Sequence, residues 1–407
     1  MRRTLAAITA AMLTILLTVS CGEKKAKYVF LFIGDGMSSA CVSMTGAYLA
    51  QERGVIGIDK INFTSFPVMG EAVSCSANHM ITCSSAAGTA MATGFKTNNS
   101  MLGVAPDTTE LESIAYKIHD AGYAVGITTS VQVNHATPAS FYGHSASRSD
   151  YYLISEQLAR TGFEFFAGGG LIQPTGKQKD QRSSYEIIAE NGYTIAYGYD
   201  DFQTKKDADK ILLVREEESE NTLAYALGRK EGELTLEQVV ESALTVLERN
   251  KKGFFLMAEG GLIDWTAHSH DLAGTIAEIL DMDTAVAVAL EFYKRHPEET
   301  LIVVTADHET GGATLKGRRA DFDLTVIDSI KVAATTTDVN EYLNNRTVMD
   351  EVNEKAAIGW STTSHAGGPV PVWAIGAGSL NFAGHIDNTD IARGICAAMG
   401  VPFEKAE

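Results

Sequence analysis

The feature that most constrains the fold is a series of short, continuously apolar and β-rich runs separated by helical patterns. These runs occupy residues 28–33, 123–128, 254–258, 301–305 and 370–375. Strands that are apolar on both faces are typical of parallel sheets covered by helices on both sides. The sequence therefore predicts an α/β fold with a large, mostly parallel central β-sheet and helices on both faces.

Caps and apolar periodicity predict three of the helices between these runs. One begins at Thr109, which has Glu112 at the matching position of a capping box. A second begins at Thr235, with Gln238 at the equivalent position, and a third covers roughly residues 273–293. Helices alternating with apolar strands support the α/β class.

The chain has 407 residues. This length is consistent with two or three domains, and equally with one large sheet that carries insertions. Residues 171–230 and 313–360 are more polar and less periodic than the rest. We therefore expect residues 28–407 to form a single domain, with these two segments as surface insertions.

The N-terminus predicts a lipoprotein-type signal peptide over residues 1–20. Two arginines precede an uncharged apolar stretch, residues 4–20, which is shorter than the roughly 20 residues needed to span a bilayer. Its end, Thr18-Val19-Ser20-Cys21, resembles a bacterial lipobox. We expect residues 21–27 to form a lipidated N-terminus and short linker. The protein would then lie in the cell envelope, periplasmic or surface-exposed, and contact the membrane only through the lipid on Cys21. A plain secreted protein and an uncleaved anchor are the alternatives.

The charge balance argues against nucleic acid as a partner. With 33 basic and 51 acidic residues the net charge is −18, so the surface repels a phosphate backbone. The cysteines that follow the signal region are too few for a disulfide scaffold, but one or two disulfide bonds are compatible with the sequence. They are Cys41, Cys75, Cys83 and Cys396.

Potential metal ligands follow several of the predicted strands almost at once. They are Asp35, Glu259 and the pair Asp307-His308. In open α/β sheets, ligands bind at the carboxyl ends of the strands, where these side chains would converge. Any one of them alone is equally consistent with a turn or a helix cap.

Asp264 and His268 lie four residues apart, so on a helix they share a face and could hold one ion. Zinc accepts mixed oxygen and nitrogen ligands, whereas Glu259 suits a harder ion such as magnesium. An isolated pair of this kind is also common as a simple surface contact.

Ser84 opens a run of small residues that ends at Gly94, a candidate helix C-cap. Small side chains let another backbone or a substrate approach closely, and a helix N-terminus favours an oxyanion or phosphate. The simpler interpretation is an N-capping serine on a packing helix. The sequence lacks a G-x-S-x-G elbow around Ser84, so a metal would have to activate it.

Taken together, six blocks in order resemble the signatures of alkaline phosphatases, over most of the chain from Tyr28 to about Gly384. They are residues 32–37, 81–89, 135–138 followed by Arg148, 259–264 followed by His268, 305–310 and 364–367. The resemblance implies two zinc ions and one magnesium ion, Ser84 as the phosphorylated nucleophile and Arg148 as the phosphate-binding residue.

The resemblance also implies which residues hold each ion. One zinc would be bound by Asp264, His268 and His365. The other zinc would be bound by Asp35, Asp307, His308 and Ser84, and the magnesium by Asp35, Glu259 and Thr137. Three dications, four carboxylates, a serine alkoxide and one arginine leave about +2 to meet a phosphate dianion.

Three positions depart from the pattern of many relatives. His135 and Trp265 stand where others carry different residues near the metals and phosphate, so we assign them to substrate binding, with a second-layer hydrogen-bonding role as the alternative for His135. Cys83 replaces an aspartate that helps hold the arginine, and simple packing is its alternative role.

The implied activity is hydrolysis of small phosphate monoesters through a phosphoserine at alkaline pH, and the resemblance adds a homodimer whose interface the sequence does not identify. One alternative is a phosphodiesterase or sulfatase of the same superfamily. A sulfatase requires a Cys or Ser that is followed two residues later by Pro and then by Arg, and Cys83 is not followed by this pattern. Another is a non-catalytic envelope lipoprotein that binds phosphate or metal, for which Ser84 would be unnecessary.

Overall fold

The computed structural model describes residues 25–316, 323–328 and 345–403. The predicted signal peptide, Cys21 and the start of the linker lie outside these residues. Within them, no helix combines the length and the apolar character needed to cross a bilayer.

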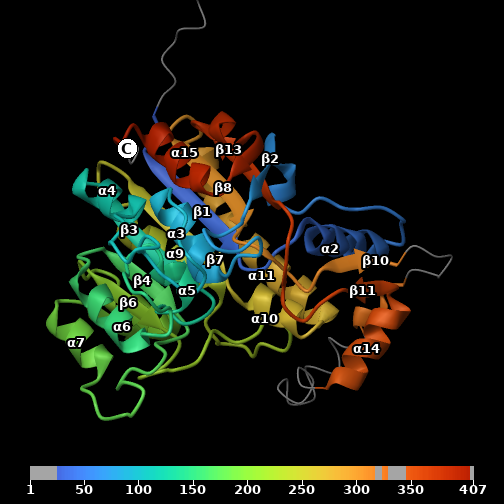
Figure 1. Ribbon diagram of the computed structural model, residues 1–407, viewed down its shortest axis with the longest axis horizontal. Coiled ribbons are helices and arrows are strands. Elements are labelled where there is room, and N and C mark those ends of the chain that lie inside the picture. Colours follow the sequence, from blue (N-terminus) through green and yellow to red (C-terminus); the bar gives the residue numbers. More distant parts are fainter. Residues whose placement is uncertain (1–24, 317–322, 329–344, 404–407) are drawn as a thin grey trace, which may run out of the picture.

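A ten-stranded sheet forms the centre of the described structure, in the order β14-β2-β13-β8-β1-β7-β3-β4-β6-β5 (Figure 1). All neighbours are parallel except β13, which is antiparallel to both β8 and β2. The mostly parallel α/β sheet is thus confirmed. The strands are β1 (Tyr28–Gly34), β2 (Val68–Val73), β3 (Ala124–Thr129), β4 (Phe165–Gly168), β5 (Thr194–Tyr197), β6 (Ile211–Val214), β7 (Phe254–Gly260), β8 (Thr300–Ala306), β13 (Val370–Gly376) and β14 (Gly384–Asp387).

Helices cover the sheet, and every residue of β7 and β8 is buried as a result. The long helix α11 packs with α9 and α2 and contacts β1, β7 and β8, whereas α15 packs with α3 and α4. The helices are α2 (Ser39–Glu52), α3 (Ser84–Thr93), α4 (Ile114–Asp120), α5 (Ala136–Ala139), α6 (Tyr151–Arg160), α7 (Ser184–Glu190), α8 (Gly198–Lys205), α9 (Leu236–Leu247), α10 (Leu262–His268), α11 (Leu272–Arg295), α14 (Arg346–Lys355) and α15 (Thr389–Met399).

Two of the three predicted helices are confirmed. Thr235 and Gln238 form the expected capping box of α9, and α11 extends the third prediction slightly at both ends. The helix predicted from Thr109 is present over Ile114–Asp120 as α4, so only its predicted start is wrong. The Asp107 side chain accepts from the Thr109 amide, and a bridge between residues 104 and 110 keeps this segment non-helical.

The predicted insertions differ from each other. Residues 171–230 are not only a surface insertion, because they supply β5 and β6 at one end of the central sheet. The apolar core of β6 is only four residues long and lies between charged residues, which hides it in the sequence. Residues 313–360 contribute the small pair β10 (Ala313–Leu315) and β11 (Ile358–Trp360) with α14, beside α2 in Figure 1.

The register of the central strands sets where the polar residues meet. Gly34 at the end of β1 is aligned with Gly260 of β7 and Ala306 of β8, so the residues at these ends share one edge of the sheet. Because β13 runs in the opposite direction, its beginning lies at that same edge. A residue that precedes β13, such as His365, can therefore join residues that follow the parallel strands.

Candidate active site and metal centre

Ser84 is the first residue of α3, with Cys83 as the N-cap, and only 3% of it is exposed. Another segment approaches Gly88 closely, as predicted: a Cβ on Gly88 would lie 2.6 Å from Ser140 Oγ and 3.4 Å from the backbone Cα of Thr137, in α5. Gly94 ends α3 in the left-handed conformation with φ +75°, as predicted. Small side chains thus let α3 pack tightly against the segment that carries Thr137.

Ser84 faces one of three clusters of potential metal ligands. His308 Nε2 lies 3.2 Å from Ser84 Oγ, 3.3 Å from Asp35 Oδ1 and 3.3 Å from Asp307 Oδ2. A tetrahedral zinc site with bonds of about 2.0 Å has ligand atoms separated by about 3.3 Å. The ligand atoms of Asp35, Asp264 and His308 also lie within 4.8 Å of one another, so Asp264 borders this cluster as well as the next. The distances from His308 Nε2 are compatible with an ion among the four side chains that the sequence analysis assigned to this zinc.

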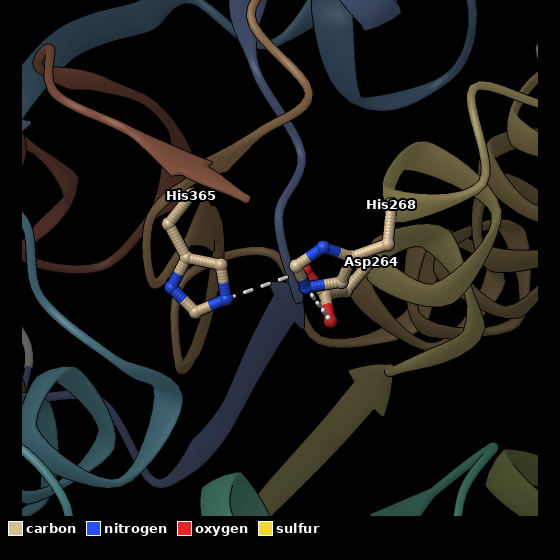
Figure 2. Close-up of side chains that lie close together, drawn as sticks. All are labelled: Asp264, His268 and His365. Atoms are coloured by element: carbon tan, nitrogen blue, oxygen red, sulfur yellow. Dashed lines mark ion pairs between the residues drawn. The ribbon is translucent and has the colours of Figure 1, made fainter. Parts of the chain in front are cut away.

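The second cluster consists of Asp264, His268 and His365, whose side chains point toward one another in Figure 2. Asp264 Oδ2 lies 3.3 Å from His268 Nε2, and Asp264 Oδ1 lies 3.9 Å from His365 Nε2. Each histidine Nδ1 contacts a backbone carbonyl, Thr363 O for His268 and Thr82 O for His365. A carbonyl only accepts, so Nδ1 must donate, and Nε2 is the nitrogen that faces a metal. In the absence of a metal, His268 Nε2 carries a proton and donates it to Asp264.

The third cluster brings Asp35, Glu259 and His135 together. Both Asp35 oxygens, Glu259 Oε1 and Thr137 Oγ1 are buried and have no hydrogen-bond partner, while Thr129 donates to the other Glu259 oxygen. Unpartnered buried oxygens are costly unless a cation neutralises them. This oxygen-rich set fits a magnesium ion, and His135, which the sequence analysis assigned to substrate binding, borders it.

The carboxylates repel one another in the absence of positive charge. Burial, followed by Asp307, raises the pKa of Asp35 well above its usual value. Burial also raises the pKa of Glu259 to about 8 and that of Asp307 to about 7. Asp264 differs: burial opposes its ionisation, but the hydrogen bond from His268 lowers its pKa below the usual value. The site therefore favours cations, as a multi-metal centre requires.

Thr310 links two of the clusters and was missed by the sequence analysis. Its hydroxyl donates to Asp264 Oδ1 over 2.5 Å, so it must accept from His308 Nδ1, 3.3 Å away. This leaves His308 Nε2 unprotonated and directed at Ser84. Thr310 ends the block 305–310 that resembles the family signature, but no pattern in the sequence assigned it a role.

Arg148 lies beside His135 rather than beside a carboxylate partner. Arg148 Nη2 donates to His135 Nε2 over 3.1 Å, and its backbone amide donates to Ser100 O. Burial and the Arg148 charge lower the pKa of His135 to about 3, so His135 accepts as a neutral ring. The Trp265 ring lies edge-on to His135, with centroids 6.2 Å apart. The Ser100 amide also donates to Cys83 Sγ, so Cys83 does more than fill space.

Residues 26–163 and 166–401 match the family model described as Alkaline phosphatase. The chain belongs to the alkaline phosphatase family. It is 30% identical to alkaline phosphatase 3 of Bacillus subtilis, with 93% of this chain and 90% of that protein covered. It is 27% identical to the alkaline phosphatase of Escherichia coli, with coverage of 94% and 88%.

Solved alkaline phosphatases have the same fold. The enzyme from the Antarctic bacterium TAB5 matches with a TM-score of 0.76 and 28% identity, over 93% of this chain and 99% of that chain. A cold-active enzyme from a psychrophilic Shewanella matches with a TM-score of 0.80 and 27% identity, over 91% and 99%. This alkaline phosphatase is accordingly a metal-binding hydrolase that acts on phosphate esters.

Proposed function

We propose that this alkaline phosphatase hydrolyses small phosphate monoesters through a phosphoserine at Ser84, in a site that holds two zinc ions and one magnesium ion. The observation that carries the proposal is the convergence of Ser84 Oγ, Asp35 and Asp307 on His308 Nε2 at 3.2–3.3 Å. The first zinc is assigned to Asp264, His268 and His365, the second to Asp35, Asp307, His308 and Ser84, and the magnesium to Asp35, Glu259 and Thr137.

The protein side chains account for each step of the reaction. Bound dications would lower the pKa of the serine hydroxyl and neutralise charge on the oxygens of the transferred group. Ser84 releases its hydroxyl proton to solvent, its Oγ attacks phosphorus, the ester P–O bond breaks, and the leaving oxygen takes a proton from solvent to depart as the alcohol. Arg148 binds two non-bridging oxygens with its planar fork. A water then attacks the phosphoserine and gives up a proton, the P–Oγ bond breaks, inorganic phosphate leaves, and Ser84 Oγ takes up a proton.

The ligand chemistry supports activity at alkaline pH. Metal ligands must be deprotonated to bind, and the pKa of Glu259 is raised to about 8 while the pKa of His268 is raised by its hydrogen bond to Asp264. Protons therefore compete with metal in acid and release the ligands as the pH rises. A solved structure of a TAB5 enzyme variant, which matches this chain with a TM-score of 0.74, has Mg bound in its M3 site. This supports magnesium as one of the proposed ions.

The test compares a phosphate monoester, a phosphate diester and a sulfate ester with zinc- and magnesium-loaded protein at alkaline pH. We expect the monoester to react fastest, because a diester lacks one of the terminal oxygens available to Arg148. Ser84→Ala should reduce steady-state hydrolysis to near background while zinc content is retained. Ser85→Ala, at the next position of the same helix, is the matched control and should keep most activity. Full activity in Ser84→Ala would remove Ser84 from the mechanism, and a preference for the diester or the sulfate would favour the alternative enzymes.

We also propose a location in the cell envelope through a lipid on Cys21, and a homodimer. Radiolabelled fatty acid incorporation that disappears in Cys21→Ala would support the lipid anchor, and sedimentation would report the oligomeric state.

A further inference from the structure

His270 lies two residues beyond the end of α10 and has no part in the chemistry described above. It is 7% exposed and adopts φ +54°, the left-handed region that residues other than glycine rarely occupy. A bulky ring in this conformation is retained only where its surroundings compensate for the backbone cost.

Both ring nitrogens of His270 are engaged. Arg346 Nη2 lies 2.8 Å from Nδ1, and Thr362 O lies 2.7 Å from Nε2. An arginine only donates and a carbonyl only accepts, so Nδ1 is the acceptor and Nε2–H the donor. The two contacts therefore select a single neutral tautomer, and that tautomer holds the Thr362 carbonyl.

Residues from α14 and β11 enclose the ring from the other side. His270 stacks on Trp360, with 5.2 Å between centroids and 3° between planes. Trp360 Nε1 donates to Asn353 Oδ1, and Asn353 Nδ2 donates back to His270 O, both over 2.9 Å. This closed circuit ties the end of α10 to a segment about 80 to 90 residues further along the chain.

The segment held by His270 also positions two metal ligands. Thr363 O, one residue after the carbonyl that His270 binds, accepts from His268 Nδ1, and His365 follows two residues later. We propose that His270 is a positioning residue for the Asp264–His268–His365 site, because it fixes residues 362–363 and thereby sets the direction of His268 and the placement of His365. The proposal rests on the proposed zinc site.

The experiment measures zinc and backbone protection as well as turnover. His270→Ala should lower zinc affinity at one of two sites by about 10- to 100-fold in a chelator competition, as is usual when a group that orients metal ligands is lost. It should also change the visible spectrum of cobalt bound in that site. His270→Gln, which keeps an N–H donor, should recover part of the affinity. The matched control is His119→Ala, since His119 also packs on an aromatic ring and has a polar partner, but is only half-buried and lies on α4. It should leave zinc affinity unchanged.

Two further readouts keep the proposal open to refutation. Arg346 is exposed, so Arg346→Met should fold normally and, by freeing the His270 tautomer, weaken zinc binding in the same direction. In chelated protein, hydrogen exchange of the Gly311 amide, which donates to Ser364 O, should be faster in His270→Ala than in wild type. Unchanged zinc affinity and unchanged exchange would overturn the role of His270. Absence of zinc from the wild-type protein would instead refute the proposed function, and the exchange measurement would still test the His270 contacts.

Discussion

Removal of the metals should make the free energy of unfolding fall as the pH rises, and Glu259 is the residue from which the size of this effect can be worked out. Glu259 is 0% exposed, and burial raises its pKa from 4.5 to about 8. The folded chain therefore binds the proton more tightly than the unfolded chain. The stability that this proton contributes is fully present below about pH 4.5 and is lost as the pH rises to about 8.

The difference of about 3.5 pH units, at about 1.4 kcal/mol per unit, gives roughly 5 kcal/mol as an upper value for Glu259. Asp307, with a pKa raised to about 7, acts in the same direction. Because these carboxylates titrate together, we expect a total loss of several kcal/mol rather than the sum of individual values. Bound cations should offset this repulsion, so the loaded protein should be far less sensitive to pH over the same range.

Urea unfolding of chelated and metal-loaded protein, at several values between about pH 5 and about pH 9, measures this difference. Glu259→Gln should flatten the pH dependence of the chelated form only. Glu278 provides a matched control, because burial also raises its pKa to about 8 but it lies on α11 among residues outside the metal clusters. Glu278→Gln should flatten both forms equally. A chelated protein whose stability does not change with pH, or whose slope is not reduced by Glu259→Gln, would refute the reasoning.

Three further perturbations test separate parts of the site. Arg148→Lys should weaken inhibition by inorganic phosphate at least about 10-fold in a rate titration, because an ammonium cannot bind two oxygens in the fork geometry of a guanidinium; unchanged inhibition would exclude Arg148 from phosphate binding. Thr310→Val should lower zinc affinity by about 10- to 100-fold in a chelator competition, whereas Thr310→Ser should stay near wild type. Gly88→Val should reduce the free energy of unfolding by about 1–3 kcal/mol through its clash with Ser140, and an equal loss in a Ser140→Gly background would contradict that cause.

The sheet and the convergence of most candidate ligands were predictable because their signals are local. The strands of the centre are buried on both faces, so they appear as uninterrupted apolar runs, and Asp35 and Asp307 follow such runs directly. The assignment of His365 came from the family resemblance alone. Its geometric reason, the reversed direction of β13, depends on strand pairing that no local pattern encodes.

The rest of the site depends on contacts between distant segments. Thr310 reaches Asp264 across 46 residues, and His270 reaches Thr362 across 92. Threonine and histidine at these positions have no periodicity or motif of their own, and their importance comes from the neighbours that the fold supplies. The wrong helix start at Thr109 also results from neighbouring segments. A capping sequence is present, but the Thr109 amide donates to Asp107 and a β-bridge pairs residues 104 and 110, so this backbone is not helical.

The charges around Arg148 determine how the electrostatic field on a phosphate differs between contact with Arg148 and a position outside the site. His135 is neutral above about pH 3 and Trp265 cannot ionise, so neither cancels the guanidinium charge. The proposed ions and ligands leave about +2 in the site, whereas the whole chain carries −18. At physiological ionic strength, fields decay within about 8 Å, so a dianion outside the site meets the acidic surface and only a dianion in contact with Arg148 meets the positive centre. Selectivity for a terminal phosphate therefore arises from short-range contacts and the desolvation they allow, not from long-range attraction.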